Sequence, residues 1–216
     1  MDKIYYDDTT YIWKTKLNFA KHKKSLIQIA KNLMQNPDGK KWDGYEYKSE
    51  TENINFIGDL LIQNTFDDIV QMGINLCKEL CKETSTQYNK LNYEAWVNVV
   101  RSKKPKQNAF INNKLKDIDK YHSHTELNEK RKIFIPMYTF VYYIQMPNIL
   151  EGEDGVLYFK GNNNKEYWIL PEEDDLIIMP GYMPHAPNNA PKSKIDRIVL
   201  AGNIGFEYLK IKKSII

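Results

Sequence analysis

The sequence is poor in several features that would place the chain in a specialised class. No apolar stretch among its 216 residues reaches the length that a membrane-spanning helix needs. Its first eight residues have neither the basic segment nor the apolar segment of a secretion signal. Its 31 basic and 28 acidic residues leave a net charge of only +3, too little for a strong field around nucleic acid. We therefore expect a cytoplasmic protein that binds neither membranes nor nucleic acid.

Cysteine is also scarce. The two cysteines, Cys77 and Cys81, lie four residues apart, a spacing that puts both on the same side of a helix. Free core cysteines are more common than a disulfide in a reducing compartment, and no third zinc ligand lies nearby in the sequence. We interpret both as core thiols. The apolar share of 42% and the aromatic share of 12% indicate a globular fold with an ordinary core.

The length fits a single domain over residues 1–216, and the first part of it is predicted to be a mostly helical support region, residues 1–90. Apolar residues at helical spacing predict one helix over Leu26–Met34 and a second over Phe66–Cys81. The segment Lys40–Asn55 has no clear period, and we predict a loop or a short hairpin there.

From residue 93 the apolar pattern changes to the period of two that is typical of strands. Short strands separated by turn sequences are predicted at Tyr93–Val100, Tyr138–Met146, Val156–Phe159, Tyr167–Leu170, Leu176–Met179 and Arg197–Phe206. Many short strands at such spacing predict a β-sandwich or jelly-roll core over residues 91–210, with the early helices packed outside one sheet. The polar segment Arg101–Lys120 is predicted to be a long surface excursion and is a candidate lid.

Histidine is rare too, and its placement is the most informative feature of the chain. Three of the four histidines fall into two short polar clusters, residues 121–126 and 183–187. His122, His124 and Glu126 are two residues apart, so an extended backbone would project all three to the same side. Two imidazoles and one carboxylate can occupy one face of Fe(II) and leave the other face for a co-substrate and O2.

An arginine completes this pattern. Arg197 follows His185 by twelve residues and lies inside an apolar, strand-like run. A buried arginine needs an anionic partner, which is either the carboxylate of a bound co-substrate or a carboxylate of the protein. Taken singly, each histidine also fits an ordinary loop or turn, so the interpretation depends on their occurrence together.

The order of these segments resembles the 2-oxoglutarate- and Fe(II)-dependent dioxygenases, in particular their prolyl-hydroxylase-like branch. The resemblance covers about residues 93–208 and runs through six segments: Tyr93–Val99, His124–Glu126, Thr139–Ile144, Gly155–Phe159, Asp175–Pro180 ahead of His185, and Arg197–Asn203. The third of these resembles a strand that carries a threonine and, four residues later, a tyrosine that binds the co-substrate; here they are Thr139 and Tyr143.

The resemblance implies a double-stranded β-helix fold and a specific chemistry. Fe(II) would be held by His124, Glu126 and His185, with 2-oxoglutarate as co-substrate and O2 as oxidant. Arg197 and Tyr143 would hold the far carboxylate of 2-oxoglutarate, and Asn98 and Asn203 would line the same pocket. The enzyme would hydroxylate a peptidyl residue such as proline, or a small molecule, and release succinate and CO2.

Two departures from the family pattern keep alternatives open. Glu126 stands where the family usually has aspartate, and Val199 stands where the branch often has a serine or threonine. Because His122 precedes His124 by two residues, a site made of His122, His124 and His185 is an alternative. Such a site would fit a cupin-type metalloprotein that does not use 2-oxoglutarate. A non-catalytic jelly-roll binding protein is the other alternative, and the sequence leaves the oligomeric state open.

Overall fold

The structure is a computed structural model of the chain. It describes residues 1–18, 23–34, 40–42, 46–51, 71–72, 74–79, 82, 91–100, 121–124, 134–188, 190 and 192–207. The predicted excursion Arg101–Lys120 and much of the second predicted helix, Phe66–Cys81, lie outside these described residues, as do Glu126 and Cys81.

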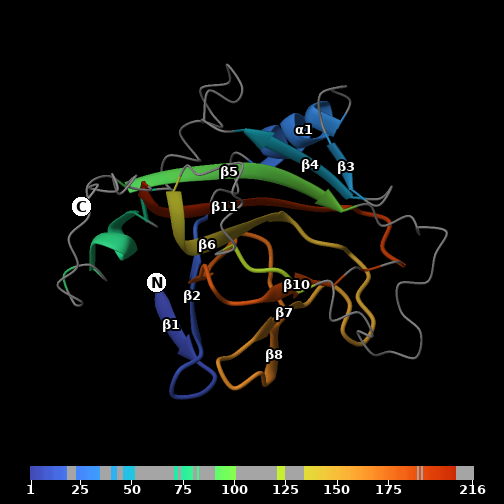
Figure 1. Cartoon of the computed structure of the whole chain (residues 1–216). Helices are drawn as coiled ribbons and strands as arrows, with labels where there is room; N and C mark the ends of the chain where they lie inside the picture. Colours follow the sequence, from blue (N-terminus) through green and yellow to red (C-terminus); the bar gives the residue numbers. More distant parts are fainter. Residues whose placement is uncertain are drawn as a thin grey trace.

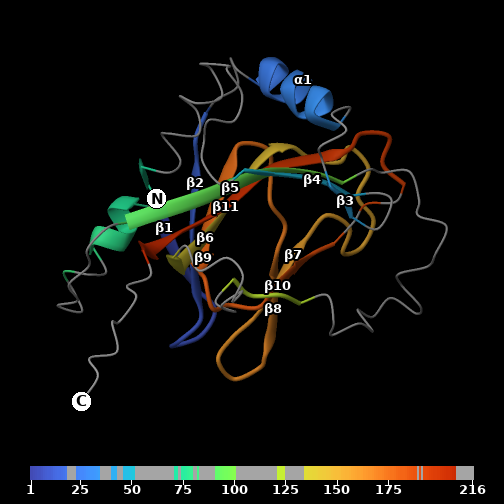
Figure 2. The same ribbon diagram turned by 45° about the horizontal axis from the view of Figure 1, so that its top comes forward.

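The described residues form two antiparallel sheets that lie one below the other (Figures 1 and 2). The larger sheet has the strand order β1-β2-β9-β6-β11-β5-β4-β3 and the smaller has the order β10-β7-β8. The bounds of the larger sheet are β1 Asp2–Tyr5, β2 Tyr11–Lys16, β3 Lys40–Trp42, β4 Glu46–Thr51, β5 Leu91–Val100, β6 Phe134–Gln145, β9 Asp175–Pro180 and β11 Arg197–Glu207. Those of the smaller sheet are β7 Leu157–Lys160, β8 Glu166–Ile169 and β10 His185–Pro187. This is the predicted double-stranded β-helix, and all six predicted strands are confirmed.

Alternating residues give the larger sheet an inner and an outer face. On β6 the inner positions Thr139, Val141 and Tyr143 lie opposite Asn203, Ala201 and Val199 of β11. The inner face packs against Leu157 and Phe159 of the smaller sheet and forms one apolar cluster with them. This inner cluster surrounds the space in which the candidate site lies.

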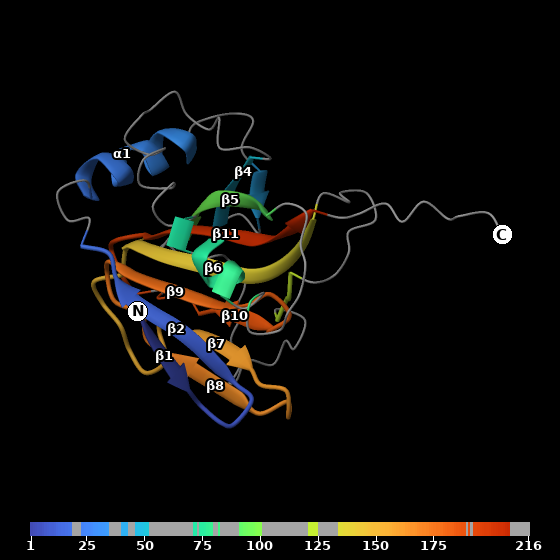
Figure 3. The same ribbon diagram turned by 90° about the vertical axis from the view of Figure 1, so that its left-hand side faces the viewer.

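The outer face of the larger sheet is covered by helix, as the sequence predicts. Helix α1, Lys23–Met34, lies on the side of the sheet away from β7 and β8 (Figures 1 and 3). Its buried residues Leu26 and Ala30 join Phe140 and Tyr142 in a second apolar cluster. Residues 71–72 and 74–79 are also helical, and they add the buried side chain of Cys77 to that cluster. No helix among the described residues has the length and apolar character to cross a membrane.

The described part of the N-terminal region contains strands that the sequence pattern does not predict. The sequence pattern predicts a mostly helical region over residues 1–90, but β1, β2, β3 and β4 lie there and belong to the larger sheet. The larger sheet therefore includes strands that precede residue 91. The sequence pattern does not predict β2 because Lys14 and Lys16 interrupt its apolar alternation. Both lie on the same inward face of the strand as Ile12, where alternation would place apolar residues. Of the two structures predicted for Lys40–Asn55, the short hairpin is present as β3–β4.

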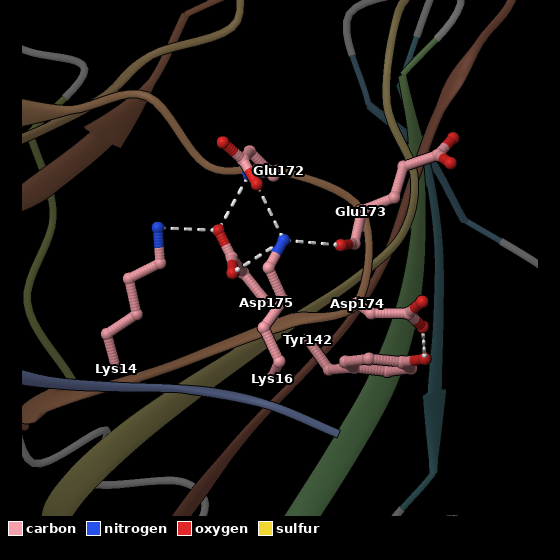
Figure 4. A network of polar contacts seen from close by, with 7 residues as sticks. All are labelled: Lys14, Lys16, Tyr142, Glu172, Glu173, Asp174 and Asp175. Atoms are coloured by element: carbon pink, nitrogen blue, oxygen red, sulfur yellow. Dashed lines mark hydrogen bonds and ion pairs between the residues drawn. The ribbon is translucent and has the colours of Figure 1, made fainter. Parts of the chain in front are cut away.

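The two inward lysines have a partner far along the chain (Figure 4). Asp175, the fully buried first residue of β9, lies 2.8 Å from Lys14 Nζ and 3.2 Å from Lys16 Nζ. Lys16 also donates a hydrogen bond to Glu172, and Tyr142 donates one to Asp174 at 2.8 Å. The lysine contacts attach β2 to β9 and to the turn that precedes β9, and they compensate the charge of the buried Asp175 carboxylate, whereas the Tyr142 contact attaches β6 to the same turn.

Candidate metal centre

Three histidines meet at the free edge of β10. The ligand nitrogens of His122, His124 and His185 all lie within 4.8 Å of one another. His122 and His185 exchange backbone hydrogen bonds, of 3.2 Å from His122 N–H and 3.0 Å from His185 N–H, so they stand directly opposite each other. His124 follows two residues later, and its N–H donates to the carbonyl of Gly181 at 3.0 Å. The predicted projection of His122 and His124 toward one site is therefore present.

His124 and His185 have the separation that a shared ion requires. Their Nε2 atoms are 3.4 Å apart. Two nitrogens that each lie about 2.1 Å from one ion can be up to about 4.2 Å apart. His185 Nδ1 donates to the Met183 carbonyl at 3.1 Å, which leaves the lone pair of His185 on Nε2, the atom that faces His124. The described residues thus fit a transition-metal ion bound by imidazole.

The protonation state of His185 also suits a metal ligand. Burial, and to a smaller extent the neighbouring charge of His122, lower the pKa of His185 to about 3, although the hydrogen bond to the Met183 carbonyl acts in the opposite direction. His185 is consequently neutral at neutral pH. Neutral imidazole is the form that binds metal ions.

Behind His124 lies a pair of buried polar side chains from the larger sheet. Thr139 on β6 and Asn203 on β11 are directly opposite each other in the strand register. The Thr139 hydroxyl donates to Asn203 Oδ1 at 2.9 Å, and Asn203 Nδ2 donates to His124 Nδ1 at 3.2 Å. Asn203, which the resemblance assigns to the co-substrate pocket, contacts a candidate metal ligand.

A cavity of about 60 Å³ extends from the histidines into the space between the sheets. Val141, Leu157, Val199 and Ala201 form its apolar walls. Arg197 also lines the cavity. It lies on β11 six residues before Asn203, the residue that contacts His124, so Arg197 and the histidines lie at opposite ends of the cavity. One end presents imidazole nitrogens and the other presents a guanidinium.

Arg197 and Tyr143 form the polar group at that second end. Arg197 is 4% exposed, and its Nη1 donates to the Asn188 carbonyl at 2.7 Å. Tyr143 is buried, and burial raises the pKa of its hydroxyl well above the ordinary value. The charge of Arg197 lowers that pKa and the charge of Asp175 raises it. Tyr143 therefore keeps its proton and can donate it in a hydrogen bond, so this end can receive an anion.

Two predicted site residues lie outside what the structure describes. Glu126 is not among the described residues, so its part in the site stays a prediction. Asn98 lies opposite Val199 in the pairing of β5 with β11, but its side chain is outside the described part. Sequence reasoning did not give Thr139 a role in the site, although the resemblance names it together with Tyr143 on one strand. It also missed β10, which has only three residues and ends at Pro187.

Comparison with known proteins gives no match to a family model and no match to a curated protein. Solved structures do match. A prolyl-4-hydroxylase from Pseudomonas putida superposes with a TM-score of 0.56 at 10% identity, covering 91% of this chain and 93% of that one. A prolyl hydroxylase from Trichoplax adhaerens, in complex with a peptide fragment of the hypoxia inducible factor, gives 0.56 at 14% identity, covering 90% and 83%.

A third solved structure has a different ligand. HygX from Streptomyces hygroscopicus, with nickel, 2-oxoglutarate and hygromycin B bound, gives a TM-score of 0.53 at 13% identity and covers 94% of this chain and 85% of that one. At these identities the likeness establishes the fold. The chain has the double-stranded β-helix fold of the prolyl hydroxylases and other 2-oxoglutarate–Fe(II) oxygenases.

Proposed function

We propose that the protein is an Fe(II)- and 2-oxoglutarate-dependent dioxygenase. One observation carries the proposal: within a fold shared with such oxygenases, a single cavity has two facing histidine nitrogens at one end and a buried Arg197 beside Tyr143 at the other. A metal centre alone would not need the second end. A keto acid with a distant carboxylate uses both ends.

In this proposal His124 and His185 hold the ion together with Glu126. Fe(II), when bound, supplies the activation of O2. His185 contributes a neutral imidazole whose orientation is fixed by the Met183 carbonyl. Glu126 contributes the carboxylate that lowers the net charge of the ion and suits Fe(II).

Arg197 and Tyr143 bind the far carboxylate of 2-oxoglutarate. Arg197 offers guanidinium donors, and Tyr143 offers a phenol that stays protonated because it is buried. The apolar walls, formed by Val141, Leu157, Val199 and Ala201, exclude water from the space between the two ends. A low local dielectric strengthens the interaction of the carboxylate with Arg197.

The substrate belongs to one of two classes. The Trichoplax adhaerens structure holds a peptide and the Streptomyces hygroscopicus structure holds hygromycin B. We propose hydroxylation of either a peptidyl residue such as proline or a small molecule, coupled to conversion of 2-oxoglutarate into succinate and CO2.

A second candidate function rests on His122. Its ligand nitrogen lies within 4.8 Å of those of both His124 and His185, so these three residues alone could bind one ion. A three-histidine centre of this kind fits a cupin-type metalloprotein that does not use 2-oxoglutarate. The two candidates differ in whether Arg197 matters and in whether Glu126 or His122 is the third ligand.

Thermal unfolding separates the two candidates. We expect Mn(II), under anaerobic conditions, to raise the melting temperature, and 2-oxoglutarate to raise it further only when Mn(II) is present, because a ligand that binds only the folded state stabilises it. Arg197→Met should remove the second increment and keep the first, whereas Lys194→Met, at an exposed position, should keep both. A metal increment with no effect of 2-oxoglutarate would favour the three-histidine candidate, and no increment at all would overturn both.

A further inference from the structure

Four hydrogen bonds join in series through the candidate metal centre. They run from Thr139 Oγ1 to Asn203 Oδ1 at 2.9 Å, from Asn203 Nδ2 to His124 Nδ1 at 3.2 Å, between the Nε2 atoms of His124 and His185 at 3.4 Å, and from His185 Nδ1 to the Met183 carbonyl at 3.1 Å. The series passes from the inner face of the larger sheet to the loop before β10.

The direction of each bond in the series follows from the groups at its two ends. The Met183 carbonyl can only accept, so His185 carries its proton on Nδ1 and presents a lone pair on Nε2. The Asn203 amide nitrogen can only donate, so His124 Nδ1 accepts. A neutral His124 then has its proton on Nε2 and donates it to His185 Nε2. In the metal-free site this proton occupies the space between the two nitrogens that would bind an ion.

Metal binding needs the opposite tautomer of His124. Ligation through Nε2 of a neutral imidazole requires the lone pair there and the proton on Nδ1. The Nδ1–H of His124 would then point at the Asn203 amide N–H, so that two donors face each other. With the Asn203 amide as it stands, the tautomer that binds metal loses a hydrogen bond.

We infer that Thr139 and Asn203 are positioning residues that set the tautomer of His124, through a half-turn of the Asn203 amide when the metal binds. After the half-turn, Asn203 Oδ1 accepts from His124 Nδ1–H and Asn203 Nδ2 donates to the Thr139 hydroxyl. Thr139 can take both parts because a hydroxyl both donates and accepts. The turn exchanges two atoms of similar size, needs no movement of β6 or β11, and neither gains nor loses a proton. The inference about Thr139 and Asn203 rests on the proposed function, in which His124 is a metal ligand.

Position 203 allows the inference to be tested by substitution. Asn203→Asp provides only acceptors when ionised, which favours the proton on His124 Nδ1, so we expect Zn(II) to bind at least as tightly as in the unchanged protein. Asn203→Leu keeps the approximate shape and removes both hydrogen bonds, and we expect Zn(II) affinity to fall by roughly 10- to 100-fold, the usual loss when the residue that orients a ligand is removed. Thr10→Val is the control for loss of a buried side-chain hydrogen bond away from the site, because the Thr10 hydroxyl donates to Asp7 in the turn between β1 and β2. It should leave the affinity unchanged.

Nitrogen-15 NMR of the unchanged protein reads the tautomers directly and does not depend on the folding of any variant. The chain has four histidines, so long-range proton–nitrogen correlations of the rings can be assigned by single substitutions. We expect His124 to carry its proton on Nε2 without metal and on Nδ1 with Zn(II), while His185 carries it on Nδ1 in both states. Zn(II) alone is the probe, without 2-oxoglutarate or O2.

The outcomes distinguish this inference from the proposed function. If Zn(II) binds to His124 but that residue already carries its proton on Nδ1 without metal, or if Asn203→Leu binds Zn(II) as tightly as the unchanged protein, the inference is wrong and the metal centre stands. If Zn(II) changes no histidine resonance, His124 is not a ligand and both fail. A tautomer change in a protein that forms no succinate would support the inference and contradict the oxygenase.

Discussion

His122 and His185 stand directly opposite each other because their backbones exchange two hydrogen bonds, of 3.2 and 3.0 Å. This pairing extends the smaller sheet beyond β10 by one bridge and brings the first histidine cluster of the sequence against the second. Both side chains consequently project to the same side of that sheet, with ring centroids 4.5 Å apart. The candidate metal centre is thus built on paired backbone rather than on a free loop, which favours a fixed arrangement of the histidines.

The first prediction concerns His185. We expect His185→Gln to abolish detectable binding of Mn(II) or Zn(II) in isothermal titration, because it removes the nitrogen that faces His124. The circular dichroism spectrum and the cooperative thermal transition should persist, since the core clusters do not depend on this residue. Loss of the cooperative transition would mean that His185 is a structural core residue.

The third ligand can be identified by comparing two substitutions. We expect Glu126→Gln to lower Fe(II) affinity severely, whereas His122→Gln should lower it only slightly. Loss of a ligand removes a direct bond to the ion, whereas loss of a neighbouring imidazole changes only the surroundings. Affinities measured anaerobically by competition with a chelator check this. The reverse ranking would assign the site to His122, His124 and His185.

The metal-free protein should lose stability in acid through His185. Its pKa is about 3 in the folded protein and near the ordinary value of 6.5 in the unfolded chain, because burial opposes the charged form. Between these values the unfolded chain binds the extra proton, so stability is fully present above about pH 6.5 and decreases as the pH falls toward 3. The contribution of His185 to the free energy of unfolding changes by on the order of 1 kcal/mol per pH unit between these two values.

Urea unfolding of the metal-free protein across this pH range measures that contribution. The matched variant is His185→Gln, which keeps all the other titrating groups. The difference between the two stability curves should grow as the pH rises from about 3 to about 6.5, the folded and unfolded pKa values of His185, and should then become constant. Parallel curves over the whole range would contradict the prediction.

The buried carboxylate of Asp175 provides a prediction for the N-terminal strand. The double substitution Lys14→Met with Lys16→Met removes both cations and leaves that carboxylate uncompensated, so we expect a loss of about 3–5 kcal/mol in the free energy of unfolding. Asp175→Asn leaves two lysines that still reach solvent, so it should lower the free energy of unfolding by less than the double lysine substitution does. Adding Asp175→Asn to the double variant should recover part of the stability. Equal losses for the double variant and for Asp175→Asn alone would show that the charges do not govern the attachment of β2.

The sequence predicts those strands whose alternation is visible locally. β6, β9 and β11 have apolar residues on both faces or in strict alternation, because both faces of the larger sheet are covered. The lysines of β2 break that pattern, since their compensating charge, Asp175, is close only in the folded chain. The three-residue β10 is too short to have a recognisable period.

In the candidate site, too, some features are visible in the sequence and others depend on contacts that exist only in the folded chain. The order of His124, His185 and Arg197 along the chain suffices to suggest a metal centre with an anion-binding arginine. The contact of Asn203 with His124 could not be predicted, because it depends on the register that sets Thr139 opposite Asn203 and on the position of the first histidine cluster. A slip of one residue in that register would turn one of these side chains to the outer face.

Formation of succinate from 2-oxoglutarate is the most direct test of the proposed oxygenase. The protein is incubated with Fe(II), O2 and 2-oxoglutarate, alone and with panels of peptides, amino acids and other small molecules, and succinate is followed by proton NMR. We expect succinate to form with the unchanged protein, to increase with a substrate, and to be absent with His185→Gln. A protein that binds Fe(II) and 2-oxoglutarate yet forms no succinate under any of these conditions would contradict the proposal.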